Sequence, residues 1–126
     1  MACMSAWVAG AGVVLEQAPL GNGDRMRLIE SECTTVYHGV TAPLHFMIDE
    51  FPKGDYDLSR VRRIGYGGAM MPAEVIEKFR QRMPWADQVH IWGMTETGPA
   101  GTYLPPCYLP RKAGSMGAAM RGCAVK

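Results

Sequence analysis

The sequence has no large excess of charge of either sign, and this lack excludes one broad class of partner. Its 126 residues include 13 Lys and Arg against 12 Asp and Glu, which gives a formal net charge of +1. The basic residues are scattered apart from Arg60, Arg62 and Arg63. A nucleic-acid-binding surface needs a basic patch or stripe that neutralises phosphates. We therefore expect no nucleic acid partner.

The sequence also has few cysteines, and their positions argue against a disulfide framework and against a zinc site. The 4 cysteines lie at positions 3, 33, 107 and 123, with no C-x-x-C pair and no histidine close enough to suggest a zinc site. A small secreted domain would carry a dense disulfide framework, and a zinc site would space its ligands closely. The pattern predicts free thiols in a cytoplasmic protein.

Long hydrophobic runs are missing as well. The most apolar stretch, residues 1–15, is shorter than the roughly 20 residues that a membrane-spanning helix needs. It also has no basic residues before its apolar core, as a signal peptide would. We expect no transmembrane segment, and we interpret this stretch as an internal helix and strand exposed by truncation.

The residues that are present indicate a single α/β core. Hydrophobic residues make up 48% of the chain, with 15 Gly and 9 Pro, which is typical of a folded protein and not of a disordered one. At this length the chain can build one core of ordinary size.

Apolar periodicity and turn residues predict alternating helices and strands. Strands separated by helices of this length imply right-handed βαβ units in a parallel sheet, whose ligands gather at the carboxyl ends of the strands. From Pro99 onward the sequence has no periodicity and predicts a loop. The predicted elements are a helix at 5–11, a strand at 13–15, a helix capped by Asp24, a strand at 34–37 followed by a turn at Gly39, a helix with Pro43 in its first turn, a strand at 63–66, a helix from Pro72 to Pro84 and a strand at 88–92.

A glycine-rich turn follows the predicted strand at 63–66. The run Gly65-Tyr66-Gly67-Gly68-Ala69 has adjacent glycines, which permit positive φ and let the backbone approach a flat ligand closely. The same run is compatible with an ordinary turn between a strand and a helix. It does not fit the Rossmann fingerprint, which needs a third glycine three residues after the second.

The segment after the last predicted strand carries the most chemistry. Trp92-Gly93-Met94-Thr95-Glu96 places an aromatic ring, a hydroxyl and a carboxylate together, a set suited to a nucleotide and its metal ion. The alternative interpretation is structural: Trp92 as a core aromatic, Thr95 as a helix N-cap and Glu96 as a first-turn acid. His38 lies beside a strand end, where a histidine is more often a packing residue than a general base.

Together these segments resemble the AMP-binding, acyl-adenylate-forming family, which includes acyl-CoA synthetases, adenylation domains and luciferases. The resemblance also covers Lys112-Ala113-Gly114-Ser115-Met116-Gly117, where Ala113 stands in the place of a common proline. It implies that residues 1–126 are an internal fragment of the large α/β N-terminal domain of such an enzyme, built from parallel βαβ units. The whole enzyme would join a carboxylic acid to ATP and then transfer the acyl group, usually to CoA.

The resemblance also implies roles for individual residues. The ring of Trp92 would stack on adenine, the hydroxyl of Thr95 would bind phosphate, and the carboxylate of Glu96 would meet Mg²⁺, so that Thr95 and Glu96 are the implied catalytic residues. The implied nucleotide-binding residues are Gly67, Gly68, Ala69, Trp92, Gly93, Met94 and Thr95, and the implied acid-binding residues are His38, Gly39 and Gly67.

Several parts of the whole enzyme have no counterpart in the sequence. It contains no Ser/Thr/Gly-rich phosphate loop, no Thr-Gly-Asp motif for the ribose and no C-terminal lid domain with its catalytic lysine. We predict that the isolated chain is not a competent ligase and that it self-associates through sheet edges left without neighbours. The alternative is a non-catalytic α/β module that binds a nucleotide or a protein.

Overall fold

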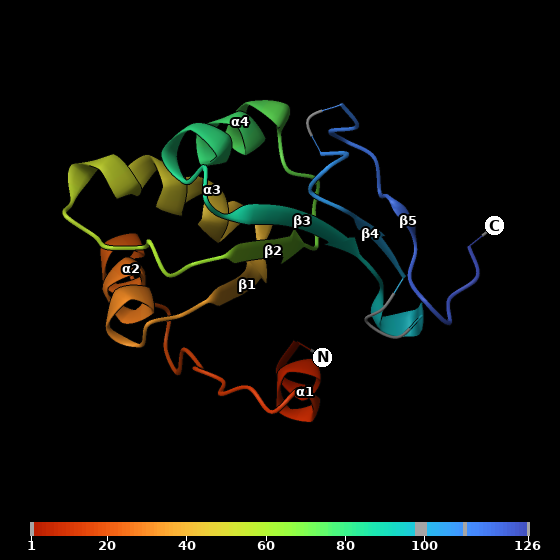
Figure 1. The fold of residues 1–126 in the computed structure, drawn as a ribbon, viewed down its shortest axis with the longest axis horizontal. Coiled ribbons are helices and arrows are strands. Elements are labelled where there is room, and N and C mark those ends of the chain that lie inside the picture. The colour runs from red at the N-terminus through yellow and green to blue at the C-terminus, as the bar shows by residue number, and fades with distance from the viewer. Residues whose placement is uncertain (1, 98–100, 110, 126) are drawn as a thin grey trace.

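The structure is a computed structural model, and it describes residues 2–97, 101–109 and 111–125 (Figure 1). From α2 to β3, helices and strands alternate along the chain, as the sequence predicts. The elements are α1 (Ala2–Val8), α2 (Asn22–Ser31), β1 (Val36–Val40), α3 (Thr41–Glu50), the 3₁₀ turn η1 (Phe51–Lys53), β2 (Arg63–Gly67), α4 (Ala73–Arg82), β3 (Asp87–Trp92), the 3₁₀ turn η2 (Thr95–Thr97), β4 (Thr102–Leu104) and β5 (Ala118–Ala119).

The strands form a 5-stranded sheet in the order β1-β2-β3-β4-β5. β1, β2 and β3 are parallel, with Val36 opposite Arg63 and Arg63 opposite Asp87, whereas β4 and β5 join antiparallel. The predicted α/β class with parallel βαβ units is therefore confirmed. The prediction of a loop beyond Pro99 is partly wrong, since β4 and β5 form there. These strands are too short to show a period of two in the sequence.

Three further predictions need correction. The strand expected at 13–15 does not form, and that segment has no regular structure. Gly39 is not a turn but lies inside β1, which begins two residues later and ends three residues later than predicted. Asp24 lies in the first turn of α2 and does not cap it, because Gly21 is the N-cap and gives no side-chain hydrogen bond. A short apolar run is a weak strand signal without a neighbouring strand to pair with.

The helix α4 forms as predicted. Pro72 is its N-cap residue, and Val75, Ile76 and Phe79 face the core. In Figure 1, α3 and α4 lie together on one side of the sheet. The buried side chains between these helices and the strands form the core: Met26, Ile29, Leu44, Met47, Ile48, Leu58, Val61, Ile64, Tyr66, Met71, Val75, Ile76, Phe79, Met83, Leu104 and Leu109.

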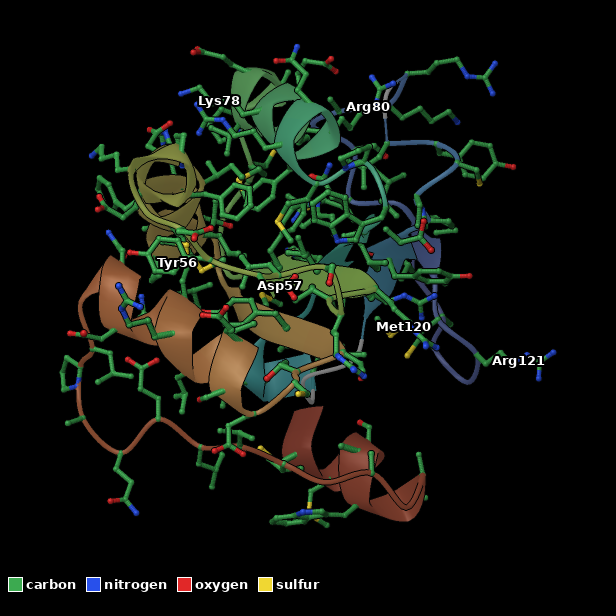
Figure 2. All side chains as sticks on the ribbon, turned by 60° about the vertical axis from the view of Figure 1, so that its left-hand side comes forward. Tyr56, Asp57, Lys78, Arg80, Met120 and Arg121 are labelled. Carbon is green, nitrogen blue, oxygen red and sulfur yellow. The ribbon has the colours of Figure 1, made fainter. Side chains whose placement is uncertain are left out.

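Ion pairs join α3 to α4 outside this core. Asp49 on α3 accepts a hydrogen bond of 2.9 Å from Lys78 on α4, and Arg82 lies 3.7 Å from the same carboxylate. Figure 2 shows Lys78 on α4 beside α3, whereas Arg121 near the C-terminal end points away from the body of the molecule. The two helices are thus held to each other as well as to the sheet.

The opposite face of the sheet is open at β1. Val36 and Val40 are each 58% exposed, and His38 between them is also exposed. Figure 1 shows α1 set apart from the sheet, and Trp7 on that helix is exposed. Within the described ranges, no helix is long and apolar enough to cross a membrane.

Candidate functional site

A groove of about 350 Å³ opens at the carboxyl ends of β1, β2 and β3. This is the edge at which ligands bind in open parallel sheets, and the volume lies within the range of small-molecule sites. The lining residues come from three segments: His38, Gly39 and Val40 from β1, Gly67 and Gly68 from β2 and the turn after it, and Ile91, Gly93, Met94 and Thr95 from β3 and the turn after it.

The β2 side of the groove requires glycine. A side chain at Gly67 would overlap with the backbone carbonyl oxygen of Ile91 on the neighbouring strand. Gly68 has φ +82°, a left-handed conformation that L-residues adopt only at a cost. The turn predicted from the adjacent glycines is therefore present, and its bare backbone forms one wall of the groove.

A buried hydroxyl reaches this turn from the neighbouring element. Thr41, the first residue of α3, is 6% exposed. Its Oγ1 donates to the carbonyl oxygen of Ala69 at 2.8 Å and lies 3.4 Å from the carbonyl oxygen of Gly67. Thr41 could not be identified from the sequence, because a threonine at the start of a helix gives no signal of a contact with a distant turn.

The β1 side of the groove carries its histidine. The imidazole of His38 lies over Gly65 on β2, where an added Cβ would come within 2.7 Å of Nδ1. Desolvation by the surrounding chain lowers the pKa of His38, which favours the neutral imidazole near pH 7. A neutral ring beside Val40 and Ile91 gives this end of the groove a largely apolar character.

The third wall is a closed turn after β3. The amide of Met94 donates to Oγ1 of Thr97, and the amide of Thr97 donates to the carbonyl oxygen of Met94, each at 3.2 Å. This local closure directs Thr95 to the groove, and Glu96 beside it is exposed to solvent. Thr95 therefore lies in the lining of the groove, and Glu96, the next residue in the chain, is exposed outside the lining.

The structure brings together seven of the residues that the sequence analysis selected: His38, Gly39, Gly67, Gly68, Gly93, Met94 and Thr95 line the groove. Ala69, Trp92 and Glu96 do not line it. Trp92 pairs with Thr102 of β4, and its ring packs against Gly101, where an added Cβ would lie 2.9 Å from Cε3. Gly98 and Pro99, at the end of the motif, lie outside the described residues.

Ile91 also lines the groove and was not selected from the sequence. The signal for Ile91 was available, because side chains alternate along a strand and place Ile91 on the face opposite His90 and Trp92. Val40 completes the run Tyr37-His38-Gly39-Val40, which resembles the strand end that lines the acid pocket in the family, and it lines the groove here.

The number of acidic side chains near the groove limits the kind of metal site that it can provide. In the part of the chain that the structure describes, no group of three or more His, Cys, Asp or Glu side chains could hold one. Mg²⁺ bound to a nucleotide usually takes only one or two carboxylates and completes its shell with phosphates and waters. The single exposed carboxylate of Glu96 fits that kind of site and does not fit a cage made by protein alone.

Known sequences that are similar to this chain agree on one family. The profile of a family described as AMP-binding enzyme matches residues 1–126. An indoleacetate–CoA ligase of Aromatoleum aromaticum is 36% identical over 119 residues, which cover 94% of this chain and 22% of the ligase. A 3-methylmercaptopropionyl-CoA ligase of Ruegeria lacuscaerulensis is 31% identical over 105 residues, covering 83% and 19%. The chain thus spans about a fifth of the length of these curated relatives.

Solved structures of CoA synthetases are also similar to this chain. O-succinylbenzoate coenzyme A synthetase of Bacillus subtilis, in complex with ATP and magnesium ion, superposes with a TM-score of 0.84 at 26% identity, covering 99% of this chain and 25% of that one. A fatty acyl CoA synthetase of Mycobacterium tuberculosis gives a TM-score of 0.74 at 30% identity, covering 92% and 23%.

Proposed function

The chain belongs to the AMP-binding enzyme family, and we propose that it is the middle part of the large N-terminal domain of an AMP-forming acid–CoA ligase. The observation that carries the proposal is the groove at the carboxyl edge of the parallel strands, where Gly67, Gly68 and Thr95 meet. The curated relatives described above are CoA ligases, which supports the same class of reaction.

The reaction of the parent enzyme would have two steps. A carboxylate oxygen of the acid attacks the α-phosphorus of ATP, so that a P–O bond to pyrophosphate breaks and an acyl-AMP mixed anhydride forms. The thiolate of CoA then attacks the acyl carbonyl carbon, AMP leaves with the electron pair of the anhydride bond, and a thioester results. Each step builds negative charge on oxygen, which hydrogen-bond donors fixed in a groove stabilise.

The nucleotide would occupy the side of the groove between β2 and the turn after β3. The backbone at Gly67, Gly68 and Ala69 allows a flat base to approach closely. The ring of Trp92 packs against Gly101 in this structure, so its stacking on the base is what the family resemblance implies. The hydroxyl of Thr95 can donate to a nonbridging phosphate oxygen. Met94 and Gly93 complete this wall.

Glu96 is the residue that would hold Mg²⁺, next to the phosphates that Thr95 contacts. The metal ion, when bound, neutralises charge that develops on the phosphate oxygens. Glu96 is exposed, so it can reach a metal ion at the mouth of the groove without the cost of a buried charge.

The acid would occupy the β1 side of the groove. His38, Gly39 and Gly67 surround this space, with Val40 and Ile91 as apolar neighbours. The lowered pKa of His38 favours the neutral ring, which suits contact with an uncharged acyl chain.

Calorimetry with a nonhydrolysable acyl-adenylate analogue tests the proposal. We expect binding by the chain and weaker binding by Trp92→Ala, whereas Trp7→Ala, which removes an indole that is 56% exposed on α1, should bind as the wild type does. Absence of binding by a folded wild-type chain would contradict the proposed site.

The isolated chain should not turn over substrate. It contains neither the lysines nor the ribose-binding carboxylate that the reaction draws on, so most of the electrostatic stabilisation of nucleotidyl transfer is missing. A pyrophosphate-release assay should therefore give no signal above background with acid, ATP and Mg²⁺. Measurable acyl-AMP formation would refute this, and analogue binding without turnover would also suit a nucleotide-binding module.

The open edge of β1 supports self-association with a second copy of the chain. β1 carries no charged residue and no proline, the two devices that commonly protect an edge strand. Antiparallel pairing of two copies about His38 would place Val36 of one copy opposite Val40 of the other, on one face. Each valine is 58% exposed in the single chain and would gain an apolar neighbour.

Sedimentation velocity tests this pairing. Val36→Lys should shift the chain toward the monomer because it places a charge in the paired edge. Val14→Lys changes another exposed valine, on the segment between α1 and α2, and should leave the distribution unchanged. A wild-type chain that stays monomeric at high concentration would refute the pairing.

A further inference from the structure

We propose that Thr41 is a positioning residue of the groove, which fixes the Gly67–Ala69 backbone at the separation from β1 that the ligand requires. The inference rests on the proposed function, because it concerns the same groove. It begins from the contact already described: the Thr41 hydroxyl donates to the Ala69 carbonyl oxygen at 2.8 Å and lies 3.4 Å from that of Gly67.

The hydroxyl spans two walls that are far apart in the sequence. Thr41 directly follows β1, whose residues His38 to Val40 line one side of the groove, and Ala69 lies 28 residues later in the turn after β2. Of the side-chain hydrogen bonds among the described residues, those that reach the backbone of residues 67–69 come from Thr41. This hydroxyl therefore connects the two walls at the mouth of the groove.

The turn needs such a connection because it has no side chains of its own to pack. Gly67 and Gly68 have no side chain, and Ala69 is exposed. Gly68 has φ +82°, and glycine in such a turn has more accessible conformations than any other residue. Without the Thr41 contact, the carbonyl of Ala69 could turn away and change the backbone surface that faces the ligand.

The contact is also well protected. Thr41 is 6% exposed, so water does not compete freely for its hydroxyl, and the hydrogen bond that it makes to Ala69 is partly buried. The threonine methyl group is retained by valine, which has nearly the same shape. Thr41→Val therefore removes the hydrogen bond with little change in packing, and Thr41→Ser keeps the hydroxyl.

Two measurements on the full chain test the role. Calorimetry with the acyl-adenylate analogue should give a Kd roughly three- to tenfold weaker for Thr41→Val, as expected for one lost hydrogen bond, and close to the wild-type value for Thr41→Ser. Hydrogen–deuterium exchange without ligand should be faster over residues 67–71 in Thr41→Val. Thr35→Val, the same change at an exposed residue before β1, is the matched control for both.

The outcomes separate this inference from the proposed function. If the wild type binds and Thr41→Val binds equally well, or if Thr41→Ser is as weak as Thr41→Val, the positioning role is refuted. If the wild type does not bind, the proposed function fails, and exchange alone decides the inference: faster exchange at 67–71 supports it and unchanged exchange refutes it. A lower melting temperature with an unchanged Kd would show a purely structural threonine, which also refutes it.

Discussion

Residues 36–92 and residues 101–125 are held together in different ways. The first region contains the parallel strands and two helices, and it holds most of the buried side chains, including Tyr66 and Phe79. The second region contributes two short antiparallel strands with few buried residues, among them Thr102, Leu104 and Leu109. It depends on backbone pairing and on a hydrogen bond from Thr102 to the carbonyl oxygen of Met116.

The groove lies where the first region ends. Two of its walls, from β1 and β2, are anchored by the core, whereas the third wall, from Gly93 to Thr95, is exposed and leads toward the second region. The walls from β1 and β2 are therefore preorganised, whereas the third wall is expected to have lower local stability. Segments that bind ligands commonly have low local stability. The predictions below test this difference in stability.

The largest effect is expected in the core of the first region. Phe79 on α4 is 1% exposed, and Phe79→Ala should lower the free energy of unfolding by about 3–5 kcal/mol, because it removes buried apolar surface and leaves a cavity. Met116→Ala, at a residue that is 38% exposed in the second region, should cost about 0.5 kcal/mol or less. Urea unfolding measures both, and equal losses would remove the proposed contrast between the regions.

A smaller effect should break the second region without unfolding the first. Gly117 and Gly122 both have φ +82°, but an added Cβ at Gly117 would overlap with the backbone of Tyr103, whereas at Gly122 nothing lies within 4 Å. Gly122→Ala should cost only the left-handed strain, roughly 1–2 kcal/mol. Gly117→Ala should also disrupt the pairing of β4 with β5.

Hydrogen exchange resolves this pair of variants. Gly117→Ala should speed exchange of the amides at 102–104 and leave α4 protected, whereas Gly122→Ala should change neither segment. Loss of protection in α4 with Gly117→Ala would mean that the two regions unfold as one unit.

A substitution at Tyr66 should raise the stability of the chain, whereas the variants above lower it. Its ring stacks on His90 at 5.3 Å, and its Oη is buried without a hydrogen-bond partner among the described residues. Burial also raises the pKa of Tyr66, so the hydroxyl stays neutral. Tyr66→Phe removes this unpaired group and should stabilise the chain by about 1 kcal/mol.

The control is Tyr103→Phe in the second region, where the side chain is 40% exposed and its hydroxyl can reach water. This variant should leave the thermal midpoint unchanged. A lower midpoint for Tyr66→Phe would show that its hydroxyl makes a stabilising contact, and the prediction would be wrong.

The smallest expected effect is on the stability of the chain at acidic pH. The hydrogen bond from Lys78 lowers the pKa of Asp49 below its ordinary value of 3.8. A depressed carboxyl pKa stabilises the fold above the unfolded-state value and loses that contribution as pH falls through the folded-state value. Asp49→Asn should therefore reduce the acid sensitivity of the midpoint below about pH 4, measured by circular dichroism.

Asp55→Asn, in the exposed loop after η1, is the control and should unfold in acid as the wild type does. Among the described residues, the ion pairs lie outside residues 101–125, so the acid effect should appear in α3 and α4. Equal acid sensitivity of the wild type and Asp49→Asn would show that the pair contributes nothing measurable, as is common for exposed pairs.

Local signals in the sequence were sufficient for some elements and not for others. The helix α4 was predicted because Pro72 begins it and its apolar residues recur on one face. The strand at 13–15 was predicted from a short apolar run alone and does not form. β4 and β5 were missed because they are too short to show a strand period and form by pairing, β4 with β3 and β5 with β4.

The same limit applies to the candidate site. The glycine turn and the segment from Gly93 to Thr95 were selected from local chemistry, and the structure brings both to one groove. The contact of Thr41 with Ala69 could not be predicted because it joins residues 28 positions apart. The stacking and metal-binding roles of Trp92 and Glu96 stay predictions.

The sequence by itself determined the alternating order of helices and strands from residue 22 to residue 92, the glycine turn and the family resemblance, because each depends on residues that are neighbours in the chain. Tertiary structure alone decided which strands pair, where β1 ends, and which residues face the groove. Strand pairing and burial are set by contacts between distant segments, and every side chain on a strand changes face with a shift of one residue.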